Sequence, residues 1–120
     1  MYHPIWWGLI KWDDTNVHIL SHTLHYGTGV FEGVRAYNTD NGGAIFRLQD
    51  HTARLFDAAS KLNIQIPLTE DDLNKAQIDV LKANNLNEAY IRPIVYLGNE
   101  SLDFHFLNKL LVLYTLHLNY

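Results

Sequence analysis

Arginine and aromatic side chains recur in this sequence at spacings that could bind an anionic small molecule. Tyr90 and Arg92 lie two positions apart in a segment with strand character, so their side chains point to one face. A guanidinium beside a phenol can receive a carboxylate, and a salt bridge at a sheet edge is the alternative. Arg54, at the border of a predicted apolar helix stripe, could hold a phosphate in its planar fork or could simply face solvent.

A glycine-rich segment at residues 25–37 offers a second candidate for chemistry. Gly27, Gly29 and Gly33 permit sharp turns or close approach, and the following residues mix Arg35 with large side chains. Such a segment could line a small-molecule site, or it could be an ordinary turn leading into a strand. Its aromatic residues would by default be core residues. These are Tyr26 and Phe31.

The histidines raise the question of a metal site. His18, His22 and His25 would share one face if this segment were helical, and pairs four residues apart can bind zinc. No glutamate lies between them as a hydrolytic zinc site requires, and the nearby glycines oppose a long helix. A structural role is therefore favoured, and we expect no metal. The absence of cysteine excludes disulfides and thiolate ligands, which suits a reducing cytoplasm.

The elements that would position these residues follow from periodicity and turn signals. A hairpin is expected at residues 5–12, with Gly8 near its turn, and further strands at residues 30–37, 44–48 and 88–97. Turns are expected at residues 13–16, which are polar, and at residues 38–43. Pro93 suggests an irregularity or an edge position in the last of these. Residues 17–26 are ambiguous between strand and helix. Strands, two helices and a strand together predict an α+β fold.

Two amphipathic helices are expected between the strands. Asp50 could cap the first, which would end near Leu62 and bury Leu55, Phe56, Ala59 and Leu62. Thr69 should begin the second, with Asp72 in place of the usual glutamate of a capping box. Asn84–Asn85 could supply a left-handed stop. The predicted buried face of this second helix comprises Leu73, Ala76, Val80 and Leu81.

Composition bounds the class of protein. The 120 residues fit one domain, and 48% hydrophobic residues allow one modest core. A net charge of −4 provides no basic surface, so no nucleic-acid partner is expected. No basic leader precedes an apolar stretch, and the apolar tail is too short and polar to span a bilayer. We therefore expect a soluble, cytoplasmic protein without a membrane partner.

Several blocks of this sequence, in matching order and spacing, resemble the branched-chain aminotransferases, fold-type IV enzymes that use pyridoxal 5'-phosphate. The third block reads Ala89-Tyr90-Ile91-Arg92-Pro93, and the second contains His51 followed by Arg54 and Leu55. Residues 17–37 carry the first block, and residues 5–7 with 11–14 resemble the family's opening hairpin. The likeness covers residues 1–102, which we expect to form the family's small N-terminal domain.

The resemblance implies roles for the candidate residues. The arginine matching Arg54 contacts the cofactor phosphate, and the residues matching Tyr90 and Arg92 accommodate substrate carboxylates. Counterparts of Tyr26 and Phe31 line a pocket for a branched aliphatic side chain, the tyrosine reaching across a dimer interface, so a homo-oligomer is expected. Arg35 could support the same site, and the matching histidines are not metal ligands. On this view all these side chains converge on a single cavity.

The resemblance also implies amino transfer between Leu, Ile or Val and 2-oxoglutarate. No lysine here matches the family's catalytic lysine, which lies in the larger second domain, so we predict a chain truncated before it and inactive alone. Residues 103–120 read as a divergent tail from a frameshift or truncation. The alternatives are a non-catalytic remnant or interaction module of the same fold, a D-amino acid aminotransferase, or an aminodeoxychorismate lyase.

Overall fold

The computed structural model describes residues 9–99 and the backbone of residues 109–116. The hairpin expected over residues 5–12 lies mostly outside the described residues. Within the described part, Trp12–Asp14 form a 3-10 turn (η1), in which the Thr15 N–H donates to the Trp12 carbonyl at 3.1 Å. The polar cluster at residues 13–16 therefore forms a turn, as predicted.

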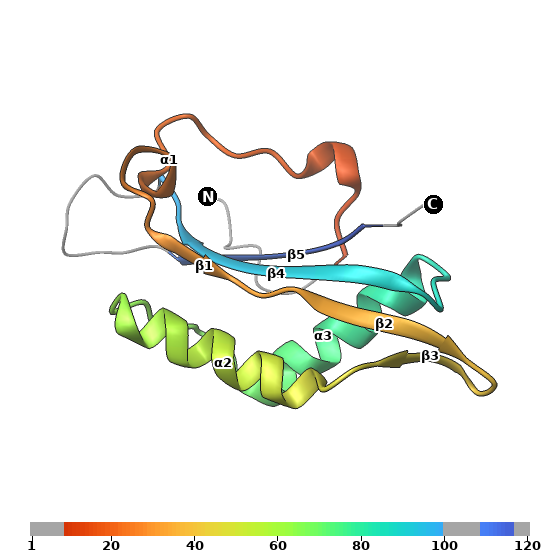
Figure 1. Cartoon of the computed structure of the whole chain (residues 1–120). Helices are drawn as coiled ribbons and strands as arrows, with labels where there is room; N and C mark the ends of the chain where they lie inside the picture. The colour runs from red at the N-terminus through yellow and green to blue at the C-terminus, as the bar shows by residue number, and fades with distance from the viewer. Residues whose placement is uncertain (1–8, 100–108, 117–120) are drawn as a thin grey trace.

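The structure is built on an antiparallel sheet with two long helices on one face, which confirms the α+β prediction (Figure 1). The path runs β1-β4-β2-β3, and β5 pairs with the other edge of β4. β4 is therefore central and sets the direction of every neighbour. The strands are β1 (Gly29–Phe31), β2 (Val34–Thr39), β3 (Gly42–Ile45), β4 (Ala89–Leu97) and β5 (Lys109–Leu116).

β1 and β2 behave as one strand with an interruption. Phe31 pairs with Ile94 and Val34 with Ile91, so the register is continuous across the gap. The Glu32 N–H donates to the Pro93 carbonyl at 3.0 Å, but proline has no N–H to return. Pro93 thus produces the predicted irregularity, although β4 is paired on both sides and is not an edge strand.

The two long helices begin at different kinds of cap. α3 (Glu70–Ala83) has the predicted capping box, because the Asp72 N–H donates to Thr69 Oγ1 and the Thr69 N–H donates to Asp72 Oδ2, each at 3.1 Å. α2 (Leu48–Lys61) starts two residues before the predicted cap. Its N-cap is Arg47 in the left-handed region, and Asp50 lies in the first turn, where it pairs with Arg47.

The core lies between these helices and the sheet as two apolar clusters. Leu55, Ala59 and Leu73 pack with Val95 in the first, and Val34, Ile91 and Leu81 share the second. The predicted stripes are right at Leu55, Ala59, Leu73 and Leu81 and wrong at Leu62, which is exposed. Leu62 is the C-cap beyond the last helical residue, Lys61, so it no longer follows the helical stripe. Gln77 is fully buried on α3, which the apolar pattern did not predict.

A short segment crosses the opposite face of the sheet (Figure 1). The ambiguous stretch at residues 17–26 becomes helical only over α1 (His22–Tyr26), which ends at Gly27 with φ of +67°. The His22 N–H donates to the Gly98 carbonyl at 3.1 Å and anchors α1 to the end of β4. No helix of the described residues is long and apolar enough to cross a membrane.

The strand β5 was not expected from the sequence, since its leucines fit neither a helical nor a strand period cleanly. Its backbone pairs with β4 from Lys109 opposite Leu97 to Leu116 opposite Tyr90. Residues 100–108 and 117–120 lie outside the described residues. The division of the chain at residue 102 into a domain and a divergent tail therefore stays a prediction.

Candidate functional site

The face of the sheet away from α2 and α3 carries an aromatic–arginine cluster made of Phe31, Tyr90 and Arg92. Strand alternation directs all three to this face. The Arg92 guanidinium lies 4.3 Å from the Phe31 ring centroid, and Arg92 Nη2 donates to the Tyr90 hydroxyl at 2.7 Å. Phe31 is 60% exposed, so the cluster is open to a ligand.

The Tyr90 hydroxyl occupies a position that only glycine at residue 33 permits. A Cβ added at Gly33 would lie 2.3 Å from this hydroxyl and 3.0 Å from the ring carbon that bears it. Gly33 is therefore needed for close approach of the phenol to the strand backbone, rather than for a positive φ. This geometry fixes where the phenol can stand beside Arg92.

Arg35 extends the same face by one cross-strand pair. It lies opposite Tyr90 in the β2–β4 register, and its guanidinium lies 5.5 Å from the Tyr37 ring centroid. The Nε atoms of Arg35 and Arg92 are buried without a hydrogen-bond partner in the described part of the chain. Two guanidinium groups therefore flank Tyr90 on this face of the sheet, which is an arrangement suited to carboxylate binding.

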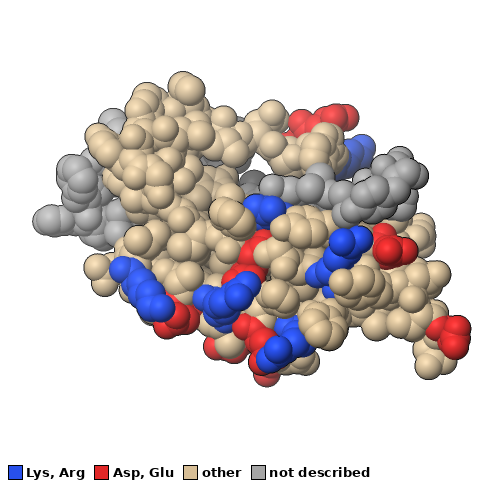
Figure 2. All heavy atoms as spheres, in the orientation of Figure 1, with Lys and Arg blue, Asp and Glu red and all other residues tan. Residues whose placement is uncertain are grey.

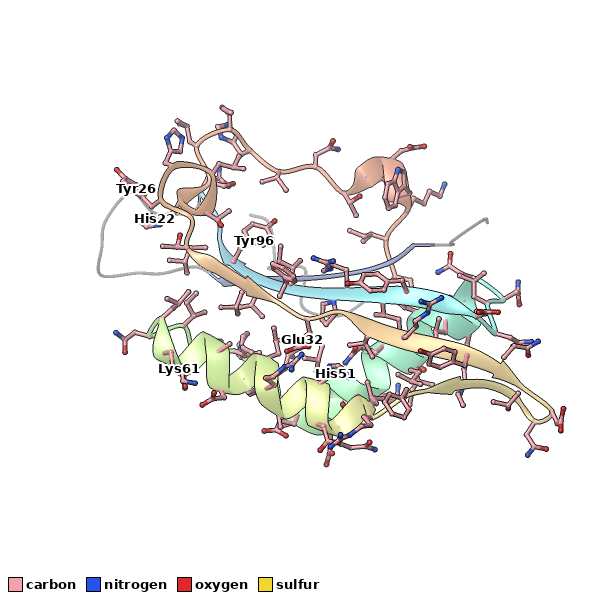
Figure 3. The ribbon with its side chains drawn as sticks, viewed as in Figure 1. His22, Tyr26, Glu32, His51, Lys61 and Tyr96 are labelled. Atoms are coloured by element: carbon pink, nitrogen blue, oxygen red, sulfur yellow. The ribbon has the colours of Figure 1, made fainter. Side chains whose placement is uncertain are left out.

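On the helix-facing side, Glu32, His51 and Arg54 form a second charged group, the Glu32 cluster (Figure 3). Arg54 donates to both carboxylate oxygens, through Nε to Oε1 and through Nη2 to Oε2 at 2.7 Å. His51 Nδ1 lies 2.9 Å from Oε2, and since a carboxylate only accepts, this nitrogen carries the proton. The cluster links β1–β2 to α2.

The charge state of Glu32 is set mainly by Arg54. The hydrogen bond from Arg54 lowers the pKa of the Glu32 carboxyl below its ordinary value of 4.5, the bond from His51 adds to this, and burial opposes it. Glu32 is therefore ionised at neutral pH although it is 5% exposed. The same pair raises the pKa of Arg54, whose side chain remains 68% exposed.

The structure does not place the predicted site residues together in one group. Phe31, Tyr90 and Arg92 meet on one face of the sheet, whereas Arg54 lies with α2 on the other. The two groups share a pair of neighbouring residues, since Phe31 contacts Arg92 and the next residue, Glu32, binds Arg54. Their convergence on a single cavity stays a prediction.

Tyr26 lies apart from both groups at the end of α1, with 70% of its surface exposed. Its ring stacks against His22, with 4.5 Å between centroids. His25 Nε2 is bound to the Ile19 carbonyl oxygen at 2.9 Å, and His22 Nδ1 to Thr28 Oγ1 at 2.7 Å. Each of these two histidines thus has a local structural contact. α1 is too short to align His18 with them on one helix face.

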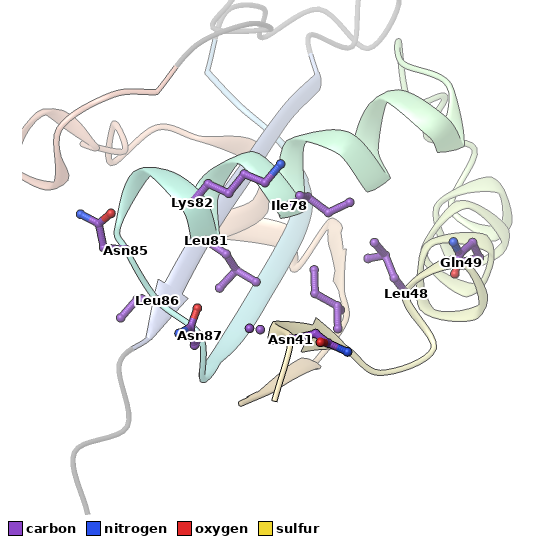
Figure 4. Close-up of a pocket in the computed structure, with 12 residues that line it drawn as sticks. Asn41, Leu48, Gln49, Ile78, Leu81, Lys82, Asn85, Leu86 and Asn87 are labelled. Carbon is purple, nitrogen blue, oxygen red and sulfur yellow. The ribbon is translucent and has the colours of Figure 1, made fainter. Parts of the chain in front are cut away.

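A cavity of about 770 Å³ opens elsewhere, on the helix side of the sheet (Figure 4). Its lining combines apolar side chains with amide side chains and Lys82. It lies between β3, the start of α2 and the end of α3, and none of the predicted site residues lines it. The cavity therefore does not identify the site that the arginines and aromatics suggest.

Glu32 is the site residue that the sequence interpretation missed. The signal was present, since Val30, Glu32 and Val34 alternate onto the face that packs against the helices. A charge on an otherwise apolar strand face requires a partner. Searching the next helix for a cation would have led to Arg54.

Comparison with known proteins gives a consistent result. The sequence matches the class IV aminotransferase family over residues 29–120. Over 100 residues, 82% of this chain, it is 55% identical to a branched-chain-amino-acid aminotransferase from Pseudomonas aeruginosa, and it spans about a third of the length of the curated relatives it matches.

Solved structures agree with the sequence match. The branched-chain amino acid aminotransferase of Escherichia coli superimposes with a TM-score of 0.85 at 35% identity, covering 89% of this chain and 36% of that one. The enzyme of the same name from Thermoproteus uzoniensis, with norvaline, gives 0.83 at 35% identity, covering 91% and 38%. Another, with pyridoxamine 5'-phosphate, gives 0.76 at 40% identity, covering 78% and 31%. The chain belongs to the class IV aminotransferase family.

Proposed function

We propose that this chain is the small-domain part of a branched-chain amino acid aminotransferase, which transfers amino groups between Leu, Ile or Val and 2-oxoglutarate. Relatives named for this activity match most of the chain, the first at 55% identity. In this role the chain supplies the substrate-facing sheet and a cation for the cofactor phosphate. The lysine that carries the chemistry would come from the larger domain.

One observation carries the proposal, namely the contact of Arg92 with both Phe31 and Tyr90. A guanidinium and a hydroxyl can receive a carboxylate of an amino acid or oxo acid, while the exposed Phe31 ring offers an aliphatic side chain an apolar wall. Arg35 adds a second cation across the strand pair. Apolar and dicarboxylate substrates could thus use different parts of one surface.

The donors of Arg54 fit the phosphate of pyridoxal 5'-phosphate. A guanidinium has five N–H donors, and Glu32 occupies one on Nε and one on Nη2. One N–H of Nη1 and the second N–H of Nη2 form the outer edge of the guanidinium, which can bind a phosphate in bidentate fashion. The high exposure of the Arg54 side chain leaves this edge accessible.

The residues of this chain would bind the cofactor and the substrate and orient them. Pyridoxal phosphate, when bound, supplies the electron sink that stabilises negative charge at the substrate Cα. Arg54 would hold the phosphate end, and the Tyr90 hydroxyl with Arg92 would orient the side-chain carboxylate of glutamate or 2-oxoglutarate. Phe31 would exclude water beside the aliphatic side chain. None of these residues needs to move a proton.

We also propose that the surface around α1 is covered in the assembled protein, as the homo-oligomer prediction requires. Figure 2 shows few charged atoms over this region and interleaved charges over α2. Contiguous apolar surface of this kind marks an interaction site. The exposed side chains are Val17, Ile19, Leu20, Leu24 and Tyr26. Light scattering on the purified protein would test this by showing a dimer or larger species.

A chimeric enzyme tests the proposed activity. Residues 9–99 of this chain would replace the matching segment of the Pseudomonas aeruginosa aminotransferase, and amino transfer from leucine to 2-oxoglutarate would be followed. We expect an active chimera, in which Arg92→Met raises KM for 2-oxoglutarate about tenfold, because a charge-assisted hydrogen bond is lost, and changes KM for leucine little. Arg47→Met serves as the control, since Arg47 is an exposed arginine outside the site.

Two results would contradict the proposal. A folded chimera that transfers amino groups from other amino acids but not from Leu, Ile or Val would assign a different substrate class. Equal effects of Arg92→Met and Arg47→Met would remove Arg92 from the site. The 120-residue polypeptide alone, mixed with pyridoxal phosphate, leucine and 2-oxoglutarate, should form no glutamate.

A further inference from the structure

Glu32 lies where an unpaired charge would be costly. Its neighbours on the same strand face, Val30 and Val34, pack in the two different apolar clusters of the core. The Glu32 side chain is only 6% exposed between them. An ionised carboxylate in such surroundings requires hydrogen bonds to both of its oxygens.

Those hydrogen bonds come from α2. Arg54 binds both carboxylate oxygens through Nε and Nη2, and His51 adds a second donor to Oε2 at 2.9 Å. Both side chains lie on the helix turn that faces the interruption between β1 and β2. The carboxylate is thus held from the helix, and in turn it holds two side chains of that helix.

The pair is strongly asymmetric in exposure. Arg54 is 68% exposed where Glu32 is 6% exposed, so the guanidinium stands at the surface with one edge fixed by a buried anchor. A free arginine on a helix would sample many rotamers, and binding would have to order it. Here two parallel hydrogen bonds fix the plane of the guanidinium before any ligand arrives.

Stability alone does not account for this arrangement. A buried ion pair is weak evidence for stability, because an apolar residue of similar volume at the same place often serves as well. The strand face on either side of Glu32 is apolar, and a leucine there would continue the pattern of Val30 and Val34. What an apolar residue could not do is orient Arg54.

We propose that Glu32 is a positioning residue, which holds the Arg54 guanidinium so that its outer Nη1–Nη2 edge is presented to the phosphate of the cofactor. His51 completes the arrangement by occupying the remaining acceptor of Oε2. The inference rests on the proposed function, because it takes the phosphate as the ligand of Arg54. Glu32 itself does not touch the cofactor and acts only through Arg54.

Selectivity for phosphate is the measurement that isolates this role. The chimeric enzyme described above, freed of cofactor, would be titrated with pyridoxal 5'-phosphate and, separately, with pyridoxal. The dissociation constant for pyridoxal divided by that for pyridoxal 5'-phosphate would be compared between variants. We expect Glu32→Gln to reduce this ratio about tenfold, as removal of a residue that orients a ligand-binding group commonly does. Affinity for pyridoxal should not change. Asp50→Asn is the matched control, since it removes a carboxylate from the exposed Arg47 on the same helix.

A second readout follows the arginine itself. The Arg54 Nε–H should give a resolved NMR signal protected from solvent exchange, and this protection should disappear in Glu32→Gln. Glu32→Asp keeps the charge but shortens the side chain, so it should also reduce the phosphate selectivity. Loss of selectivity with loss of Nε–H protection in either folded variant would support the inference.

Other outcomes would overturn it in distinguishable ways. Unchanged selectivity in folded Glu32→Gln, with reduced selectivity in Arg54→Gln, would refute the positioning role and leave the proposed phosphate contact standing. Unchanged selectivity in Arg54→Gln as well would remove Arg54 from the phosphate site and refute both. Failure of both Glu32 variants to fold would show that the carboxylate is needed for the fold, which also overturns the proposal.

Discussion

The charged residues on the two faces of the sheet differ in burial and in hydrogen bonding. On the helix-facing side, the carboxylate of Glu32 is buried and receives donors from Arg54 and His51. On the other side, Arg92 lies over the partly exposed ring of Phe31, and its buried Nε has no partner among the described residues. The same strand segment, residues 31–32, contributes to both.

This difference distinguishes side chains that fix the structure around them from side chains that can bind a ligand. A charge whose hydrogen bonds are all made within the fold fixes its neighbours, and a charge with unused donors can accept a ligand. The helix-facing side should therefore control stability and the orientation of Arg54. The open face should control which substrate is accepted, with little influence on folding.

The largest expected effect tests this separation directly. Leu55→Ala should lower the free energy of unfolding by about 3 kcal/mol, because Leu55 is fully buried in the core and leaves a cavity. Phe31→Ala, on the open face, should cost about 1 kcal/mol at most, since it loses mainly its contact with Arg92. Urea denaturation measures both. Similar losses for the two variants would contradict the distinction between the faces.

An intermediate effect is expected at Gly33. An alanine Cβ would lie 2.3 Å from the Tyr90 hydroxyl, so Gly33→Ala should displace the phenol and lower stability by about 1–2 kcal/mol. The NMR signals of Tyr90 and Arg92 should shift together. Gly98→Ala is the control, because no atom of the described residues lies within 4 Å of an added Cβ there. Unchanged Tyr90 signals in Gly33→Ala would show that the close approach is not required.

The smallest expected effect is on the stability of the protein at acid pH. Because the folded-state pKa of Glu32 is lowered, its contribution to stability is fully present above the ordinary carboxyl pKa of 4.5 and is lost as pH falls through the folded value. Glu32→Gln should therefore lose less stability than the wild type between neutral pH and acid. Denaturation at several pH values measures this difference. Parallel curves for the two proteins would mean that Glu32 does not titrate with unfolding.

Much of the fold could be predicted because its signals are local. The capping box of Thr69 and Asp72 formed as expected, as did the hairpin turn before β3 and the left-handed residue Asn85 after α3. Helix boundaries were less predictable. The start of α2 depends on Arg47 adopting a positive φ, for which the sequence offers no steric reason, and on Leu48 entering the core.

The arrangement of the candidate site was harder to predict. Alternation correctly placed Tyr90 and Arg92 on one face, since a strand period of two is a local property. Their contact with Phe31 depends on the β1–β4 register, and the pairing of Arg54 with Glu32 depends on how α2 crosses the sheet. Residue spacing carries no information about either of these long-range contacts.

The α+β class, the strand alternation and the family can be predicted from local patterns, because propensity, capping and motif spacing act over a few residues. The hold of a buried carboxylate on Arg54, and the placement of Arg54 and Arg92 on opposite faces of one sheet, cannot be predicted in this way. Burial and pairing of charges depend on which elements pack together. That choice is made by the whole core.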